Sequence, residues 1–185
     1  MITIPILDYG IKKEQLEVSD SQIEETIALL KRKKDKTFNK NLNLEPGHTK
    51  REDLYFEETE YKEKPLSSLV DLILEKVQDS DNYELTLMHG QIQNPGQSCS
   101  YHYHCTDLDE NRKKDLSFVF YLNKCDSDGV LRFPLSVYKK RITLSFNGEK
   151  KDLILFPSWL PHYVTLNESD QDRILIAGNL RFNNT

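Results

Sequence analysis

The second half of this 185-residue chain breaks into short runs of β-branched, aromatic and aliphatic residues, each closed by turn-forming residues. Runs of this length, separated by Gly, Pro, Asn and Asp, are typical of antiparallel strands joined by tight turns. Seven such runs are visible: Glu84–Gln93, Leu116–Asn123, Val130–Phe133, Arg141–Phe146, Asp152–Phe156, His162–Leu166 and Arg173–Phe182. This half therefore predicts an antiparallel β-sandwich or jelly roll.

The first half follows a helical period instead. Apolar residues spaced by three and four predict one amphipathic helix over Ser21–Lys34 and a second from Pro65 to about Asp79. β-Branched residues in Met1–Leu7 predict an edge strand. Thr37–Tyr61 is polar and predicts a long surface loop, with a short strand at Asp53–Phe56.

These elements predict one domain of the α+β class, mainly β, with the helices packed on one sheet. The expected division is a helical part with its long loop over residues 1–82 and a jelly-roll core over 83–185. A chain of 185 residues is long enough to bury one substantial core.

The net charge of −5 argues against a protein that follows a nucleic-acid backbone, which requires a basic surface. The basic run Lys31–Lys34 is instead typical of a solvated helix C-terminus. Neither a signal peptide nor a membrane span is expected. Three cysteines without a C-x-x-C pair indicate no disulfide framework, so we expect a cytoplasmic protein.

Histidines supply the candidate metal ligands. His102 and His104 are two residues apart, so in an extended chain both imidazoles point to the same face. His162, which follows the proline-stiffened stretch 156–161, is the leading candidate for a third ligand. Three protein ligands on one face leave three positions of an iron ion open. A zinc site with three histidines and a bound water is an alternative, as are surface histidines without a metal.

The remaining histidines and cysteines point less clearly to chemistry. His89 is expected to be a core or sheet-face residue, and His48 a solvent-exposed residue of the loop. Cys99 and Cys105 flank the histidine pair, but no third group is apparent that would orient a Cys–His nucleophile. Trp159, Tyr103 and Arg132 are candidates for lining a substrate mouth near the metal.

The ordered set of motifs over residues 85–182 resembles the core of prolyl-hydroxylase-like, Fe(II)- and 2-oxoglutarate-dependent dioxygenases, and in particular their bacterial and phage-type branch with an H-x-H. The motifs that carry the resemblance are Asn94-Pro95-Gly96, His102-x-His104, the stretch Leu116–Asn123, Gly129–Pro134, Leu153–Val164 and Arg173–Leu180. Each is ordinary alone, and their order is what is specific. The resemblance implies a double-stranded β-helix (jelly roll).

The resemblance also implies roles for single residues. His102 and His162 would bind iron, Arg173 would bind the far carboxylate of 2-oxoglutarate, and Tyr121 would donate its hydroxyl to the same carboxylate. His104 departs from the pattern, because most relatives carry Asp or Glu there. A histidine leaves the site one unit more positive, and Asp107 is the alternative second ligand.

The predicted activity is hydroxylation of a C–H bond, with succinate and carbon dioxide as co-products. The expected cofactors are Fe(II), 2-oxoglutarate as co-substrate and ascorbate as a reductant. The expected partners are dioxygen and a peptide, protein or small-molecule substrate, with a prolyl residue as the leading substrate. A homodimer is an open alternative for the oligomeric state. No nucleic acid and no membrane are expected as partners. The alternative function is a non-redox metal-binding protein of the cupin type or a sugar-binding β-sandwich.

Overall fold

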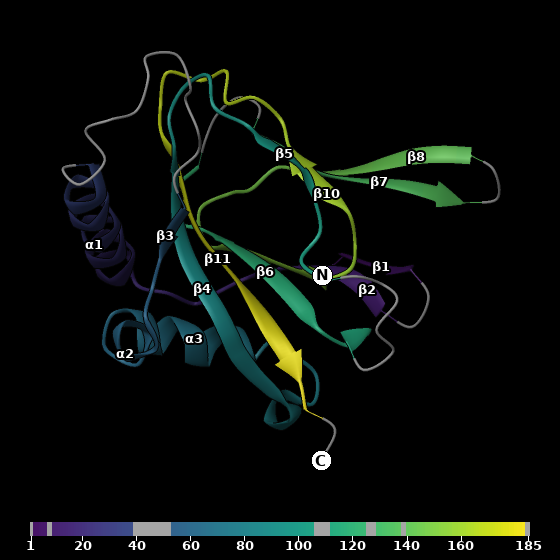
Figure 1. Ribbon diagram of the computed structural model, residues 1–185, viewed down its shortest axis with the longest axis horizontal. Helices are drawn as coiled ribbons and strands as arrows, with labels where there is room; N and C mark the ends of the chain where they lie inside the picture. Colours follow the sequence, from purple (N-terminus) through teal and green to yellow (C-terminus); the bar gives the residue numbers. More distant parts are fainter. Residues whose placement is uncertain are drawn as a thin grey trace.

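The computed structural model describes residues 2–6, 9–38, 53–105, 112–124, 129–137 and 140–183. Within these ranges the strands form two antiparallel sheets, one of seven strands and one of four. The helices lie against the outer face of the larger sheet, and the smaller sheet faces its inner side (Figure 1). The predicted jelly roll, with its helices on one sheet, is confirmed.

The two sheets are assembled from strands far apart in the sequence. The larger sheet has, in spatial order, β1 (Ile2–Ile6), β2 (Tyr9–Gln15), β9 (Asp152–Pro157), β6 (Leu116–Tyr121), β11 (Arg173–Phe182), β4 (Tyr83–Gln93) and β3 (Asp53–Tyr55). The smaller sheet has β5 (Cys99–His102), β10 (His162–Val164), β7 (Leu131–Val137) and β8 (Lys140–Phe146). Each of the seven runs predicted in the second half forms a strand, and the edge strand predicted at the N-terminus is β1.

One strand is longer than the sequence indicates. The run ending at Phe133 was expected to stop before Pro134, whereas β7 continues to Val137. Pairing with β10 reaches only Leu131 and Arg132, so the rest of β7 pairs with β8 alone. On such an open edge a proline costs no hydrogen bond of the ladder.

The helices also differ at their ends from the prediction. Helix α1 spans Asp20–Phe38, beyond the predicted end at Lys34, and α3 spans Leu66–Leu74, short of Asp79. Ser19 caps α1, because its Oγ accepts a hydrogen bond from the backbone nitrogen of Gln22 at 3.2 Å. The strand β2, the short helix α2 (Glu58–Tyr61) and the 3-10 turn η1 (Ser80–Asn82) were not predicted.

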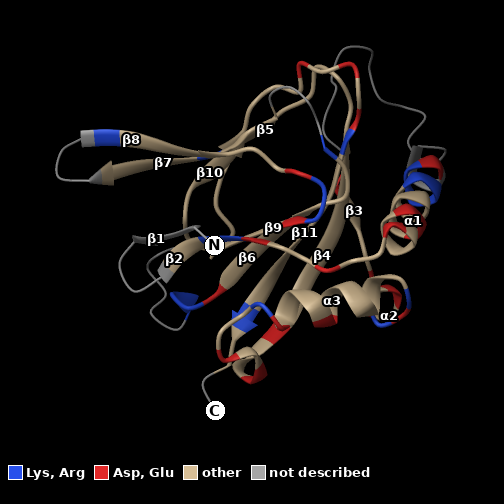
Figure 2. Ribbon diagram, turned by 180° about the vertical axis from the view of Figure 1, so that it is seen from behind, with Lys and Arg blue, Asp and Glu red and all other residues tan. Residues whose placement is uncertain are grey.

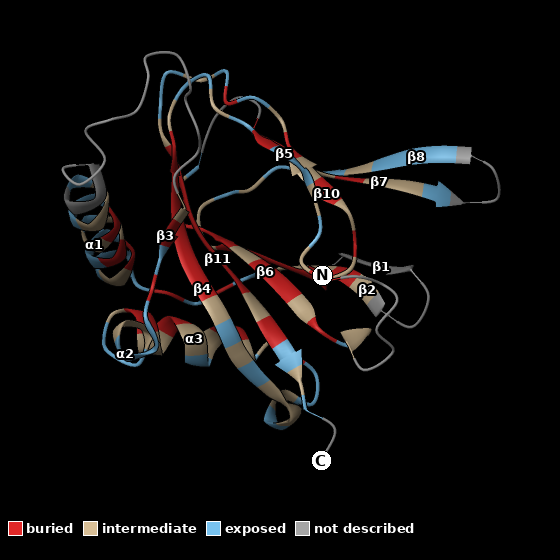
Figure 3. Ribbon diagram, in the orientation of Figure 1, coloured by how far each residue is buried: buried red, intermediate tan, exposed pale blue. Residues whose placement is uncertain are grey.

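Side-chain alternation divides the larger sheet into two faces. On β4 the side chains of Met88 and Ile92 join the core beneath the helices. His89 and Gln91, which point the other way, therefore face the smaller sheet. The same alternation on β6 and β11 buries both faces of the central strands (Figure 3). Gly90 allows α1 to approach this sheet, because a Cβ there would lie 1.9 Å from a methyl carbon of Leu30.

Charged residues concentrate on the helices and the connecting segments, and the central strands carry few (Figure 2). Basic residues mark the C-terminal part of α1, as expected from the run Lys31–Lys34. Among the described residues, no helix is both long and apolar enough to cross a membrane.

Candidate metal centre

Strands β5 and β10 pair so that His162 lies directly opposite His102. His104 follows the end of β5, and its backbone nitrogen donates a hydrogen bond to the carbonyl oxygen of Ser158 at 2.8 Å. Ser158 in turn is held to the larger sheet, because its hydroxyl lies 2.8 Å from that of Ser117. Both sheets thus position the histidine that lies outside a strand.

The three imidazoles converge as the sequence predicted. Their ring centroids are 4.3 Å apart between His102 and His162 and 5.1 Å apart in each of the two pairs that include His104. The Nε2 atoms of His104 and His162 are 3.3 Å apart. One ligand nitrogen from each residue can be chosen so that all three lie within 4.8 Å of one another.

Hydrogen bonds to backbone carbonyls orient two of these rings. The Nδ1 of His102 lies 2.8 Å from the carbonyl oxygen of Ser100, and the Nδ1 of His162 lies 2.9 Å from that of Leu160. A carbonyl only accepts, so Nδ1 carries the proton in both residues. In each neutral ring the lone pair is then on Nε2. This is the arrangement in which metal-binding histidines are usually held.

The donor set fits a divalent metal ion. Two nitrogens bound to one ion at about 2.1 Å each lie roughly 3.0–3.4 Å apart, which matches the pair formed by His104 and His162. The ligand nitrogens of all three residues lie within 4.8 Å of one another, and the side chains of His102 and His104 are partly exposed. Neutral imidazoles suit both iron and zinc. Asp107, the alternative second ligand, lies outside the described residues.

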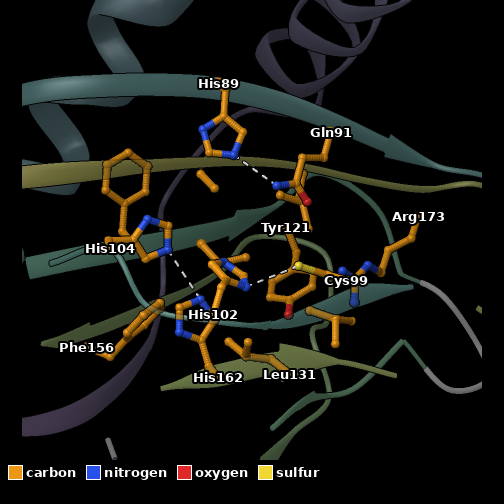
Figure 4. Close-up of a pocket in the computed structure, with 15 residues that line it drawn as sticks. His89, Gln91, Cys99, His102, His104, Tyr121, Leu131, Phe156, His162 and Arg173 are labelled. Carbon is orange, nitrogen blue, oxygen red and sulfur yellow. Dashed lines mark hydrogen bonds between the residues drawn. The ribbon is translucent and has the colours of Figure 1, made fainter. Parts of the chain in front are cut away.

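The three histidines form one end of a pocket between the two sheets (Figure 4). Apolar walls separate the polar groups; they are formed by Leu131, Phe156, Val164, Leu175 and Ala177.

Arg173 and Tyr121 also line this pocket, and both side chains are almost fully buried. Figure 4 shows Tyr121 between the histidines and Arg173. The guanidinium carbon lies 5.9 Å from the centroid of the tyrosine ring, and Nη1 of Arg173 donates a hydrogen bond to the carbonyl oxygen of Gly129. Burial raises the pKa of the Tyr121 hydroxyl, so this group is protonated at neutral pH and can donate.

His89 and Gln91 form a polar wall that the sequence did not reveal. Both residues are buried, line the pocket from β4 and lie 2.9 Å apart between the ring Nε2 and the amide Nε2 (Figure 4). A carboxylate oxygen of Asp53 is 3.9 Å from the same ring nitrogen. The expectation of a sheet-face histidine is confirmed for His89, which does not belong to the metal triad. In the sequence, the two-residue spacing of His89 and Gln91 on one strand indicated that their side chains share a face.

The other residues singled out in the sequence lie beside this pocket or outside the description. Trp159, Tyr103 and Arg132 are not among the residues that line it, and His48 and Cys125 are not described. Cys99 lines the pocket, with its sulfur 3.5 Å from Nδ1 of His102. That nitrogen already carries the proton donated to Ser100, so in a neutral ring it cannot take one from the thiol.

Solved structures with the same fold span several chemistries. A prolyl-4-hydroxylase from Pseudomonas putida is 18% identical to this chain. The match covers 96% of this chain and 95% of the hydroxylase, with a TM-score of 0.66. HygX from Streptomyces hygroscopicus, with nickel and 2-oxoglutarate bound, is 15% identical to this chain. The match covers 94% of this chain and 83% of HygX, with a TM-score of 0.68. SnoK, a non-heme α-ketoglutarate-dependent carbocyclase from nogalamycin biosynthesis, is 13% identical to this chain. The match covers 94% of this chain and 79% of SnoK, with a TM-score of 0.68.

No protein-family model matches the chain, and no curated protein is significantly similar to it in sequence. At these low identities the likeness shows the fold, which extends over nearly the whole chain and most of each of the three proteins.

Proposed function

We propose that this protein is an Fe(II)- and 2-oxoglutarate-dependent oxygenase that hydroxylates a C–H bond. One observation carries the proposal: three imidazoles converge at one end of a pocket that also contains a buried arginine. A metal triad without a buried cation would suit many metalloproteins. The combination suits a dianionic co-substrate that chelates the metal through one end and binds a guanidinium through the other.

His102, His104 and His162 would hold the iron, and the open positions would face the pocket. Bound iron supplies the activation of dioxygen and the oxidative decarboxylation of 2-oxoglutarate to succinate and carbon dioxide. The protein contributes placement. Arg173 would bind the distal carboxylate, and Tyr121 would donate its hydroxyl to the same group.

An all-histidine triad has an electrostatic consequence for this co-substrate. Three neutral imidazoles leave the full charge of the divalent ion in place, whereas an aspartate at position 104 would cancel one unit. The iron centre and Arg173 together then present three positive charges to a doubly negative ligand. This favours binding of the co-substrate, and the apolar walls strengthen the attraction by excluding water.

The fold likeness supports the class of reaction more than the substrate. HygX has been solved with 2-oxoglutarate bound, and the Pseudomonas putida protein is a prolyl-4-hydroxylase. SnoK is a carbocyclase, so the fold serves other oxidations as well. A prolyl residue of a peptide or protein is our leading substrate.

The test is turnover of 2-oxoglutarate by the purified protein. With Fe(II) and ascorbate it should form succinate, even slowly in the absence of the prime substrate, and with Zn(II) it should form none. Absence of succinate together with a preference for zinc and no binding of 2-oxoglutarate would establish a non-redox metal protein instead.

Two variants separate the proposed roles. Arg173→Ala should raise the concentration of 2-oxoglutarate needed for half-maximal turnover while leaving iron affinity nearly unchanged. Loss of iron from this variant would show that Arg173 is structural. Comparing iron affinity in His104→Ala and Asp107→Ala identifies the second ligand, and we expect the loss in His104→Ala.

A further inference from the structure

Gln93, the last residue of β4, is fully buried with its amide group unsatisfied. In the part of the chain that the structure describes, neither Nε2 nor Oε1 has a hydrogen-bond partner. Its backbone is well held, because Nδ2 of Asn167 donates to the Gln93 carbonyl oxygen at 3.0 Å. Burying an amide without partners is unfavourable, whereas an apolar side chain at the same place would avoid that desolvation cost. The position therefore calls for a polar ligand.

The register of the sheet places this amide beside the proposed carboxylate site. Gln93 is the direct cross-strand partner of Arg173, with no irregularity in the pairing nearby. Directly opposite residues of an antiparallel pair have their side chains on the same face. Since His89 and Gln91 of the same strand line the pocket, alternation directs Gln93 to this face as well.

A second unsatisfied group lies close by. The Tyr121 hydroxyl is buried and, among the described residues, has no hydrogen-bond partner either. Tyr121 and Gln91 both pair with Leu175, which is two residues from Arg173 on β11, so Tyr121 lies two residues along the sheet from the pair formed by Arg173 and Gln93. A guanidinium, a phenol and an amide at one place supply several N–H and O–H donors. An anion with two oxygen atoms satisfies such donors best.

We propose that Gln93 is a specificity-determining residue that donates its Nε2–H to the distal carboxylate of the co-substrate, beside Arg173 and Tyr121. Its Oε1 would accept a hydrogen bond from the guanidinium, which orders the two side chains around the anion. The site then selects 2-oxo acids that carry a second carboxylate. This inference rests on the proposed function, because it assumes that a 2-oxo acid binds the metal.

Two variants of Gln93 and two ligands test the assignment. Gln93→Met keeps the unbranched shape without hydrogen bonding, and Gln93→Glu places a negative charge beside the carboxylate. Affinity is measured by calorimetric titration of the Zn(II)-loaded protein, without turnover. The ligands are 2-oxoglutarate and 2-oxobutanoate, which lacks the distal carboxylate.

We expect Gln93→Met to weaken 2-oxoglutarate about tenfold, which corresponds to about 1.4 kcal/mol, and to change 2-oxobutanoate less than about twofold. Gln93→Glu should weaken 2-oxoglutarate about a hundredfold and 2-oxobutanoate far less. Equal effects on both ligands, or none on 2-oxoglutarate in either variant, would overturn the assignment. Failure of the proposed function would appear differently, as an inability of the unaltered protein to bind either ligand.

Discussion

Gly129 holds Arg173 in place, and a single methyl group at this residue should disturb the proposed carboxylate site. Gly129 has a φ of +73°, and a Cβ there would lie 3.1 Å from Cδ and 3.2 Å from Nη1 of Arg173. These separations are tight, so the arginine would have to move by a few tenths of an ångström. The moving nitrogen is the one that donates to the Gly129 carbonyl oxygen.

Gly96 provides the matched control. Its φ is +80°, and a Cβ at this residue would meet nothing within 4 Å. Alanine in the left-handed region costs about 1–2 kcal/mol at either glycine. A domain of this size loses about 2–4 °C in Tm per kcal/mol, so Gly96→Ala should lower Tm by about 2–8 °C. Gly129→Ala carries the same strain and also weakens a charge-assisted hydrogen bond worth about 1.5–3 kcal/mol.

The expected result combines stability and binding. If half of the free energy of that hydrogen bond is lost, Gly129→Ala should melt about 1.5–6 °C below Gly96→Ala in a thermal denaturation followed by circular dichroism. Titration of the Zn(II)-loaded proteins should show about fivefold weaker binding of 2-oxoglutarate to Gly129→Ala, with unchanged metal affinity. If both alanine variants bind 2-oxoglutarate as the unaltered protein does, the reasoning about Arg173 is refuted.

Three further predictions concern the scaffold around the site. Ser117→Ala removes the 2.8 Å contact with the Ser158 hydroxyl and the hydrogen bond that Ser117 Oγ donates to Oδ1 of Asn179 at 3.0 Å, and it should cost about 2 kcal/mol, seen as a Tm lower by about 4–8 °C; an unchanged Tm would mean that these contacts are not stabilising. Tyr121 is buried with a raised pKa, so above pH 10 the unfolded state loses a proton that the folded state keeps, and stability falls as pH rises. Denaturant midpoints measured from pH 8 to 11 should therefore fall less steeply in Tyr121→Phe, and equal slopes would contradict this. Gly178→Ala should destabilise by about 3 kcal/mol or more, because its Cβ would lie 2.4 Å from the carbonyl oxygen of Leu87; a denaturation curve close to that of the unaltered protein would show that the sheet yields easily.

The strands of the second half were predictable because their pattern is strong. Turn residues bound them on both sides, and period-two spacing was sufficient to place His102 and His104 on one side of the chain. The strand β2 was missed for the opposite reason. Gly10 and three charged residues at 12–14 conceal it, and its pairing with β1 and β9 satisfies the backbone rather than burying a continuous apolar face.

The polar residues of β4 show where sequence reasoning ends. Alternation indicates that His89, Gln91 and Gln93 share one face, but not whether that face meets water or a pocket. Polar residues opposite an apolar face usually face water, so alternation alone does not predict a pocket here. The smaller sheet, whose strands β5, β10 and β7 are far apart in the sequence, closes over these side chains and makes them walls of a pocket.

The most direct test of the central claim is the position of iron in a crystal of this protein. Crystals grown without oxygen, with Fe(II) and 2-oxoglutarate, should show one anomalous peak at the iron edge about 2.0–2.2 Å from a nitrogen each of His102, His104 and His162. The co-substrate should extend from that ion to Arg173. An iron peak elsewhere, or one that leaves any of the three imidazoles uncoordinated, would contradict the account.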